Sequence, residues 1–570
     1  MKEISDNARM LIFVALTVLI FGIFSRFYKP PVQPPQNQQQ TSGQAAPGQP
    51  NSTAALAQTA ATSQAAAKAP PVIPAIQASD EKSVVVESPL YRVELSNRGA
   101  VVRSWQLKKY FDDQTPPHPL DLVDPSASQQ LGYPFSLMLP DTHLESEANV
   151  AALYQVTTSA GTADGTLTAP VDVTFHWSDG HLDITKKLSF STDYELAVEA
   201  SASLDGKPVT PIGIAWRGGF GDRAVYKASQ LVSVYYQTGG KLSLLQYKKL
   251  GVPTNQSEYA EQPGSMEFLG IEDQFFTAAF IPNGTDVTLW HFTQYHTTSG
   301  GSEPEAEMAA GTKTGAPLKM RVFVGPKDLA LLSKVQPSLE ALINFGWTGI
   351  IAKPLLFVLQ WMHKYIPNYG WAIVLFTLAL TTALFPIRLT TSRSMRKMQA
   401  VAPEIRSIQD RYKKYSMSDP RKRKMNEEVM AVYSREGINP MGSCLPMLIQ
   451  LPFLWAFYRM LSGAIELRHA PWIAWIHDLS AKDPYYILPI AMTLTSFVMM
   501  KMTPQPTAGD PAQQKMMAFM PLMMGAIFIN LSSGLNLYYF VNNLVGMAQQ
   551  WYLNKSMPPP NNSKFKKKKE

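Results

Sequence analysis

The sequence contains a single cysteine, Cys444, among its 570 residues. One cysteine excludes an internal disulfide and any metal site that is built from several cysteines. Charged side chains are also scarce: they make up 17% of the residues, against about 25% in typical soluble domains. This shortage disfavours an ordinary soluble enzyme and a disordered chain alike. The sequence also has no G-x-x-x-x-G-K-[ST] motif, with which many nucleotide hydrolases hold phosphates.

An apolar run lies close to the amino terminus. Residues 10–25 read MLIFVALTVLIFGIFS, with two basic residues before the run and two after it. The run is short for a membrane span of about 20 residues, although long basic side chains extend its reach. A cleaved signal peptide is the alternative, but no pair of small residues precedes the expected cleavage region. We therefore predict an uncleaved signal-anchor helix over residues 1–29.

Residues 30–80 are rich in proline, glutamine and alanine, and Lys68 is the only charged residue from Pro30 to Ser79. Such a segment cannot bury enough apolar surface to offset the entropy lost on ordering. Its prolines favour extended, fairly stiff stretches. We predict a disordered linker.

Short runs with period-two alternation of apolar and polar residues follow, over residues 81–335. VDVTFHWSDGHLDITKKLSF and TDVTLWHFTQYHTT are examples. The turn sequences Asp179-Gly180 and Asn283-Gly284 predict β-hairpins at those two places. Many such strands over residues 81–325, about 245 residues, favour a large, all-β, mainly antiparallel sandwich. Because this domain follows a signal anchor and has no cysteine pair, we expect it to be exported without needing disulfides.

The last part of the chain has the composition of a membrane protein. Residues 336–368 carry an apolar face that is interrupted by polar residues, which favours an amphipathic helix lying in the membrane interface, although a full span over residues 350–370 is the alternative. Five apolar stretches follow, and with the signal anchor they predict about six transmembrane helices: Tyr369–Ile387, Ser443–Ser462, Tyr485–Met502, Met516–Ser532 and Leu535–Leu553. Ser533-Gly534 separates the last two, which predicts a tight helical hairpin.

The charge distribution predicts the orientation. Residues 388–435 hold 13 Lys or Arg against 5 Asp or Glu, a net charge of +8, and positive segments beside spans stay in the cytoplasm. Counting spans back from this segment places the β domain in the periplasm and the amino terminus in the cytoplasm. Residues 556–570, which end in KFKKKKE, form a basic tail that the same rule places in the cytoplasm.

The basic segment has helical periodicity, and Asp419-Pro420 is typical of a helix start. We predict a cytoplasmic helical hairpin over residues 388–437 with exposed cations, among them Arg396, Lys397, Arg406 and Arg411. Binding to nucleic acid is one interpretation of such a cluster. Contact with anionic lipid headgroups is favoured, because no stacking aromatic residues accompany the cations.

Long motifs of the membrane half resemble a known family. GINPMGSCLPMLIQLPFLWAFYRML, APWIAWIHDLSAKDPYYILPI, QQKMMAFMPLMMGAIF and SGLNLYYFVNNLVGMAQQ are similar to the signatures of the YidC/Oxa/Alb family of membrane protein insertases. In the outer domain, IEDQFFTAAFIP and RVFVGPKD resemble the periplasmic domain of the Gram-negative members. The resemblance implies a β-supersandwich, a fold shared with sugar mutarotases. It also implies insertion and folding of nascent membrane proteins in the bacterial inner membrane, alone or beside the Sec translocon, with no cofactor and no enzymatic reaction.

The same resemblance implies a polar groove that is open to lipid and cytoplasm. The family usually carries an arginine in the helix that corresponds to Tyr369–Ile387, but alignment places Thr381 at that position. On one regular helix Thr377, Thr381 and Arg388 would share a face, so Arg388 could partly substitute for the arginine that the family carries. The alternative is that Arg388 is only the first positive residue on the cytoplasmic side of the span. Polar residues within the predicted spans, and two tyrosines at positions that match the family, are expected to line this groove. The predicted groove residues are Thr377, Thr381, Arg388, Gln450, Tyr538, Tyr539 and Asn542. For the amide side chains, hydrogen bonding between helices is the alternative.

Two other classes of function compete with this interpretation. Secondary transporters usually have internal repeats and charged residues at the membrane midplane, and we find neither. A membrane-tethered periplasmic enzyme acting on glycans would need catalytic groups, which the fold alone does not imply. No His/Glu pair stands out, and we interpret the histidines of the domain as scattered core or surface residues: His143, His176, His181, His291 and His296.

Overall fold

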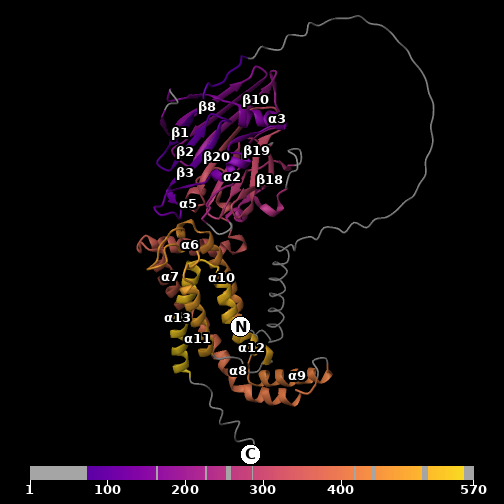
Figure 1. Cartoon of the computed structure of the whole chain (residues 1–570). Helices are drawn as coiled ribbons and strands as arrows, with labels where there is room; N and C mark the ends of the chain where they lie inside the picture. Colours follow the sequence, from indigo (N-terminus) through magenta and orange to yellow (C-terminus); the bar gives the residue numbers. More distant parts are fainter. Residues whose placement is uncertain are drawn as a thin grey trace, which may run out of the picture. The chain divides into compact units, whose positions relative to one another are not determined.

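The described part of the chain consists of a strand-rich region followed by a helical region (Figure 1). This computed structural model describes residues 74–161, 165–224, 228–251, 259–284, 287–343, 345–415, 419–438, 445–503 and 511–557. Residues from Ala69 onward form one compact unit. The predicted signal anchor, most of the predicted linker, Cys444 and nearly all of the basic tail lie outside the described residues.

The strand-rich region contains three sheets. The first has the order β4-β3-β2-β1-β7 and consists of β1 Ser83–Glu87, β2 Tyr91–Ser96, β3 Val101–Phe111, β4 Pro119–Asp121 and β7 Thr166–Thr168. The second has the order β14-β13-β16-β17-β20-β10-β9-β8-β6, with β11 beside β10, and consists of β6 Gln155–Thr158, β8 Val171–Ser178, β9 Leu182–Phe190, β10 Glu195–Leu204, β11 Lys207–Pro208, β13 Ser233–Thr238, β14 Lys241–Gln246, β16 Phe268–Glu272, β17 Phe276–Pro282 and β20 Leu318–Pro326. The third has the order β15-β18-β19-β12-β5 and consists of β5 Ser136–Met138, β12 Ile212–Trp216, β15 Ala260–Gly264, β18 Val287–Thr298 and β19 Gly301–Thr312. Short helices α2 Pro125–Leu131, α3 Thr142–Ser146, α4 Ala228–Leu231 and α5 Leu329–Leu332 connect the strands.

One of the two hairpin predictions is confirmed and the other is wrong. β8 and β9 pair around Asp179, whose carboxylate accepts the backbone N–H of Leu182 at 2.6 Å, and Gly180 has the positive φ of +99° that the turn requires. Asn283-Gly284 instead follows β17, which pairs with β16 and β20, and precedes β18, which belongs to another sheet. The turn sequence therefore marks a crossing between sheets, because turn residues do not specify which strand comes next.

Aromatic side chains from different sheets meet in the core of the β domain. Trp105 of β3 stacks on Phe135 with ring centroids 6.0 Å apart, and Phe135 lies the same distance from Trp216 of β12. Phe280 of β17 packs against Phe135 as well. Burying each large aromatic side chain contributes about 1.5–3 kcal/mol. This cluster therefore joins all three sheets and fixes an all-β domain.

The β domain also buries a carboxyl that makes its stability depend on pH. Burial raises the pKa of Glu307 to about 8 from 4.5, although Arg217 opposes the shift. Between pH 4.5 and about 8, the folded state therefore keeps a proton on Glu307 that the unfolded state releases. The contribution of this proton to the free energy of unfolding is complete below pH 4.5 and is lost as the pH rises through about 8. We expect Glu307→Gln, which stays neutral, to remove this loss.

The measurement is thermal unfolding of the full chain in detergent at about pH 5 and about pH 9, followed by tryptophan fluorescence. The midpoint of the parent protein should fall more between these pH values than that of the variant. Burial lowers the pKa of Lys186 to about 7 from 10.5, so this lysine raises the stability as the pH rises between these two values. The effect of Lys186 is the same in the parent protein and in the variant. Identical pH profiles for parent and variant would show that Glu307 is already ionised in the folded state.

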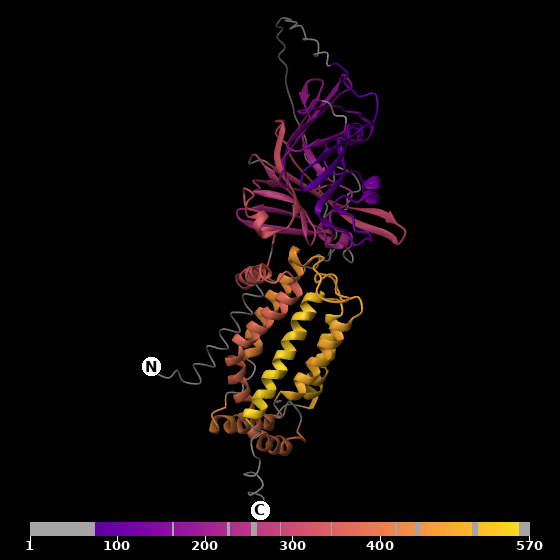
Figure 2. The same ribbon diagram turned by 90° about the vertical axis from the view of Figure 1, so that its left-hand side faces the viewer.

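The helical region contains eight helices among the described residues. They are α6 Gly349–His363, α7 Tyr369–Ala383, α8 Phe385–Arg411, α9 Pro420–Arg435, α10 Leu445–Gly463, α11 Ile487–Met502, α12 Pro511–Phe528 and α13 Ser533–Ser556. Of these, no single helix is both long enough and apolar enough to cross a membrane by itself, whereas α7 and α8 together pass that test with a bend of 53°. α13 runs between its neighbours α7 and α11 (Figure 2).

The predicted continuous helix and the predicted turn in this region both differ from the structure, and the ends of the other predicted transmembrane helices lie up to five residues from the observed ones. The stretch Tyr369–Ile387 is not one helix, because α7 ends at Ala383 and α8 begins at Phe385. Pro386 explains the break, since its ring lacks an N–H and clashes with the carbonyl four residues earlier in a continuous helix. Ser533-Gly534 is not the turn of the last hairpin but the start of α13, where Gly534 packs against the backbone of Leu479.

Helices α8 and α9 pack antiparallel. Arg435 pairs with Glu404 at 2.7 Å and Arg411 pairs with Glu428 at 2.9 Å, and a small apolar core lies between the helices: Met398, Val401, Ile405, Ile408, Val432, Tyr433 and Ile438. The predicted start of α9 is confirmed, because the Asp419 carboxylate accepts the backbone N–H of Arg421 at 2.9 Å. The location of this pair in the cytoplasm stays a prediction.

Candidate functional site

A row of polar groups follows one face of α13. Asn542, Gly546 and Gln549 are spaced by four and three residues, so they lie on the same side of the helix. This side faces α7 and the start of α8, which contribute Thr381 and Arg388. We call Thr381, Arg388, Asn542 and Gln549 the polar row.

Hydrogen bonds connect the four members of the polar row. The Thr381 hydroxyl donates to Asn542 Oδ1 at 3.2 Å, and Gln549 Nε2 donates to the Thr381 carbonyl at 3.2 Å. Arg388 Nη1 donates to Gln549 Oε1 at 2.9 Å. The predicted association of Thr381 with Arg388 therefore arises through α13, although the two residues lie on different helices rather than on one.

Gly546 provides the space for the Arg388 guanidinium. A Cβ at this position would lie 2.7 Å from Arg388 Nη1, so any larger residue would displace the cation. Arg388 is half-buried, and within the described residues it makes this one side-chain hydrogen bond and no ion pair. A guanidinium carries five N–H donors, so most of its donors stay available to another molecule.

The polar row was only partly visible in the sequence. Gln549 and Gly546 are functional candidates that the sequence reasoning missed, although their spacing from Asn542 was a readable signal. Thr377 does not belong to the row, because it is fully buried and its hydroxyl donates to the carbonyl of Ile373 in its own helix at 2.6 Å. The prediction that Thr377 lines a groove is therefore not supported by its contacts.

Tyr538 and Tyr539 form an aromatic cluster beside the row. Tyr538 lies one turn before Asn542 and stacks on Phe457 of α10 with ring centroids 4.2 Å apart, while Tyr539 packs edge-on against Phe528 at 4.7 Å. Both tyrosines thus join α13 to α10 and α12. The side chain of Gln450 lies outside the described residues.

Asn543 acts as a link between helices. Its Nδ2 donates to Ser496 Oγ at 2.7 Å and to the carbonyl of Met492 at 3.2 Å, so it joins α13 to α11. This geometry agrees with the alternative that an amide in this span serves helix packing.

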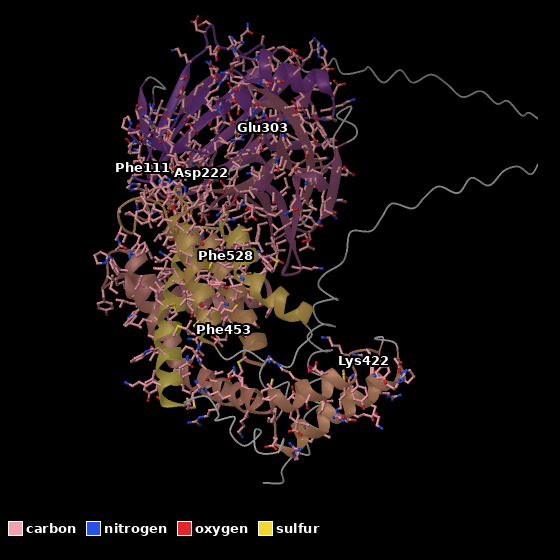
Figure 3. The ribbon with its side chains drawn as sticks, turned by 60° about the horizontal axis from the view of Figure 1, so that its bottom comes forward. Phe111, Asp222, Glu303, Lys422, Phe453 and Phe528 are labelled. Atoms are coloured by element: carbon pink, nitrogen blue, oxygen red, sulfur yellow. The ribbon has the colours of Figure 1, made fainter. Side chains whose placement is uncertain are left out.

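The four predicted cations of the basic hairpin differ in their surroundings. Arg396 donates to Asn554 Oδ1 at 2.7 Å and to the carbonyl of Leu553 at 3.3 Å, which places its charge beside the carboxyl end of α13, where a cation is favourable. Lys397, Arg406 and Arg411 are exposed. Figure 3 shows Lys422 in the same basic region. Arg396 therefore joins α8 to α13 and Arg411 pairs with Glu428 of α9, whereas the side chains of Lys397 and Arg406 are exposed.

Large apolar side chains are exposed on the outside of α11 and α12. The most exposed are Ile490, Leu494, Phe519, Leu522, Met523 and Ile527. An apolar surface of this size is unfavourable in water and is typical of a surface that contacts lipid or a partner. Together with the polar row inside, it is typical of a helical membrane protein.

The β domain brings together ionisable groups that the sequence did not connect. The ionisable atoms of Asp124, His296 and Glu305 lie within 4.8 Å of one another, and His296 is a buried core residue, as one of the two predicted kinds of histidine. Arg223 pairs with Asp124 at 2.9 Å and with Glu305 at 2.9 Å. Its guanidinium thus already occupies the cationic position between the carboxylates, and we assign no metal to this cluster.

These features define a class: a helical membrane protein with a polar internal row and a large all-β domain. Two family models match the chain, the YidC periplasmic domain over residues 83–358 and the 60Kd inner membrane protein over residues 361–561. The membrane protein insertase YidC of Geobacter metallireducens is 32% identical, with 96% of this chain and 98% of the relative covered. That of Thioalkalivibrio sulfidiphilus is 30% identical, with 97% and 99% covered.

Among solved structures, a crystal structure described as an active YidC insertase with its first transmembrane domain resolved aligns with 85% of this chain and 95% of its own, at 18% identity and a TM-score of 0.34. The chain belongs to the YidC family of membrane protein insertases. The family resemblance of the sequence motifs is thereby confirmed. Membership also decides against the secondary transporter.

Proposed function

We propose that this protein inserts and folds other membrane proteins in the inner membrane by offering the polar row to the polar segments of its substrates. The observation that carries the proposal is the Arg388 guanidinium, which is held by Gln549 in the space beside Gly546 and keeps most of its donors available. Family membership supports the general insertase activity, and the polar row is the site at which we expect a substrate to bind.

The work of such a site is physical rather than catalytic. A polar tail that crosses the apolar slab leaves backbone groups without partners, at several kcal/mol for each. Hydroxyl, amide and guanidinium groups in the row would pair with them during the crossing. The apolar helix of the substrate would then leave along the exposed apolar faces of α11 and α12.

Arg388 supplies the cation that Thr381 does not. The resemblance implies an arginine at the position of Thr381, and Arg388 reaches its neighbourhood through Gln549, which bonds both residues. We infer that the charge of the groove has moved by one helix without leaving the site. An acidic substrate tail would still meet a cation there.

We propose a multi-pass topology with both termini in the cytoplasm, about six spans, the β domain in the periplasm and the α8–α9 pair in the cytoplasm. The contact between Arg396 and Asn554 supports it, because it puts α8 beside the carboxyl end of α13, so the basic hairpin and the tail share one side. α6 runs across the other helices (Figure 1), as an interfacial helix would.

The partners we propose follow from the same surfaces. Nascent membrane proteins occupy the row, and the Sec translocon supplies some of them. The exposed cations Lys397, Arg406 and Arg411 face anionic lipid headgroups. The basic tail docks on the ribosome.

A depletion experiment tests the proposed function. Cells that are depleted of their own insertase would express this chain, and protease protection would report insertion of a small single-span protein with an acidic tail. Restored insertion is the expected result. Failure of a stable, membrane-localised chain to restore insertion of any small substrate would contradict the proposal.

Deletion of residues 564–570 should weaken ribosome binding at low salt. KFKKKKE holds five lysines and one glutamate, and such an arm binds polyanions with about 1 kcal/mol per charge and a steep salt dependence. Ribosome co-sedimentation at low and high salt measures the effect, and insertion of a released substrate should stay intact. Unchanged or salt-independent co-sedimentation after the deletion would remove the tail from docking.

A further inference from the structure

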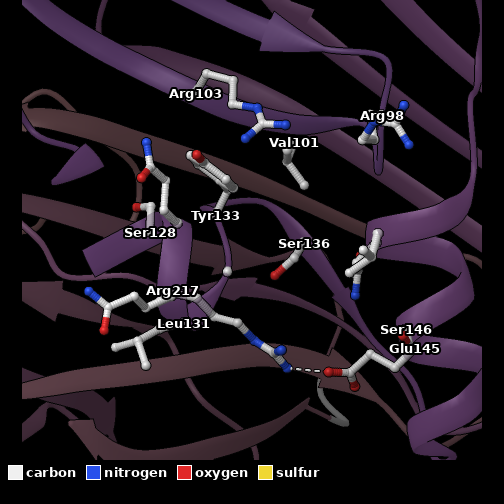
Figure 4. Close-up of a pocket in the computed structure, with 15 residues that line it drawn as sticks. Arg98, Val101, Arg103, Ser128, Leu131, Tyr133, Ser136, Glu145, Ser146 and Arg217 are labelled. Atoms are coloured by element: carbon white, nitrogen blue, oxygen red, sulfur yellow. Dashed lines mark hydrogen bonds and ion pairs between the residues drawn. The ribbon is translucent and has the colours of Figure 1, made fainter. Parts of the chain in front are cut away.

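The β domain contains an open pocket of about 440 Å³, a volume typical of sites for small molecules. Its wall is assembled from β3, α2, β5, α3 and the segment after β12, so residues far apart in the sequence meet there. No member of the Asp124 cluster or of the polar row lines the pocket. Figure 4 shows the side chains that surround it.

Cationic donors dominate the wall. Three arginines line the pocket against one glutamate: Arg98, Arg103, Arg217 and Glu145. The Arg103 guanidinium lies 3.9 Å from the centre of the Tyr133 ring, a cation–π contact that positions it, and Figure 4 shows the two side chains beside each other. Its one ion pair, with Glu81, is long at 3.5 Å.

Glu145 and Asn149 already use their acceptor oxygens, whereas two donors of the wall have no partner. Glu145 accepts from Arg217 at 2.5 Å and from the backbone N–H of Leu139 at 3.1 Å. Asn149 exchanges both of its amide hydrogen bonds with the backbone of Leu137. In contrast, the Ser136 hydroxyl is 2% exposed and has no partner, and the Nε of Arg217 is likewise buried and unpaired.

A buried hydroxyl without a partner costs about 1–3 kcal/mol, so a ligand in the cavity that pairs with the Ser136 hydroxyl would gain from that contact. Glu81 lies outside the lining and pairs with Arg98 at 2.7 Å and with Arg103 at 3.5 Å, while Glu145 pairs with Arg217. The remaining donors of Arg103, Ser136 and Arg217 favour a ligand that brings acceptors, and a negative charge suits the guanidinium groups. Carboxylates and phosphates suit the planar fork of arginine. Apolar contacts from Tyr133, Leu131 and Val150 would cover a small carbon body.

We propose that this pocket binds a small anionic molecule that bears a carboxylate or a phosphate monoester, with the anion between Arg103, Ser136 and Arg217. The site is independent of the insertase activity and needs no covalent step. The same anionic chemistry occurs on free metabolites and on lipid headgroups, and the experiment below separates these sources.

Isothermal titration calorimetry of the full chain in detergent tests the proposal with two matched pairs of probes, glucuronate against glucose and glycerol 3-phosphate against glycerol. At least one anionic member should bind at least tenfold more tightly than its neutral match. Arg103→Gln should weaken that binding at least tenfold and Ser136→Ala severalfold. Ser136→Ala removes an unpaired hydroxyl, so it should not lower the thermal midpoint.

Arg92→Gln is the matched control, because Arg92 pairs with Glu87 at 3.1 Å on the surface of β2 and does not line the pocket. It should leave the affinity unchanged. Equal affinity for anionic and neutral probes, no binding of any probe, or binding that survives Arg103→Gln would overturn the proposal. Weaker glycerol 3-phosphate binding in phosphatidylglycerol nanodiscs than in phosphatidylcholine nanodiscs assigns the site to a lipid headgroup, and equal binding assigns it to a free metabolite.

Discussion

Replacing Arg388 with glutamine is expected to lower the insertion rate of substrates with acidic tails by roughly tenfold to a hundredfold. A hydrogen bond to a charged group contributes about 1.5–3 kcal/mol, and each 1.4 kcal/mol corresponds to about tenfold in rate. Arg388 is the cation of the polar row, and its only acceptor among the described residues is the neutral amide of Gln549. Loss of the cation leaves the row with neutral groups.

Adding Thr381→Arg to Arg388→Gln should restore most of the insertion. The side chain of Thr381 donates to Asn542 of the polar row, and its carbonyl accepts from Gln549, the partner of Arg388, so an arginine at position 381 returns a positive charge to the row. The restoration would also show that the neighbourhood of Thr381 is wet, since a dry site would penalise an arginine by about 2.5–3.5 kcal/mol. Arg388→Lys should have an intermediate effect, because lysine keeps the charge and loses the planar fork.

Arg393→Gln provides the matched control. Arg393 lies in the same helix and is exposed, so its loss removes one positive charge without touching the row. Protease protection of a substrate with an acidic tail, at equal amounts of each variant in the membrane, measures the effect. Full insertion by Arg388→Gln, or a double variant no better than the single one, would show that the cation has no role in the groove.

The sequence grouped Thr381 with Arg388 on a premise about the helix that the structure does not bear out. Thr381 and Arg388 were paired by the period of one continuous helix, but Pro386 breaks that helix and bends the chain by 53°. The pairing survives because α13 bonds both segments through Gln549. A contact between residues 161 positions apart depends on helix packing, which periodicity within one helix cannot show.

The β domain shows the same limit. Alternation of apolar and polar residues identifies strands, because each residue reports its own burial. It does not report the partner strand, so Asn283-Gly284 was taken for a hairpin although β17 and β18 lie in different sheets. The cluster of Asp124, His296 and Glu305 was missed for the same reason, since its members come from a helix cap and two strands.

Breaking the ion pair between Arg468 and Asp222 is expected to destabilise the protein by about 3–5 kcal/mol. Arg468 follows α10, and its Nε donates to Asp222 Oδ2 of the β domain at 2.7 Å, while another guanidinium nitrogen donates to the carbonyl of Phe111 at 2.7 Å. Both side chains of the pair are 3% exposed, and Figure 3 shows Phe111 and Asp222 close together. Arg468→Met leaves the Asp222 carboxylate buried without its cation.

Removing both charges should recover most of the loss, because a buried ion pair adds little beyond an apolar pair of similar size. Arg468→Met with Asp222→Leu is therefore expected to be more stable than either single variant. The adjacent His469 is the control: it pairs with Asp113, but that pair is largely exposed, at 29% and 61%. His469→Gln should cost less than about 1 kcal/mol.

Urea unfolding of the full chain in detergent, together with limited proteolysis between the β domain and α10, measures these differences. The single variants should lose the cooperative transition that joins the β domain to the helices, so that the β domain unfolds separately. This follows because the pair is the most deeply buried contact that links the two regions through charged groups among the described residues. If Arg468→Met and His469→Gln behave alike, the buried pair does not couple the β domain to the membrane helices, and the link must come from apolar packing alone.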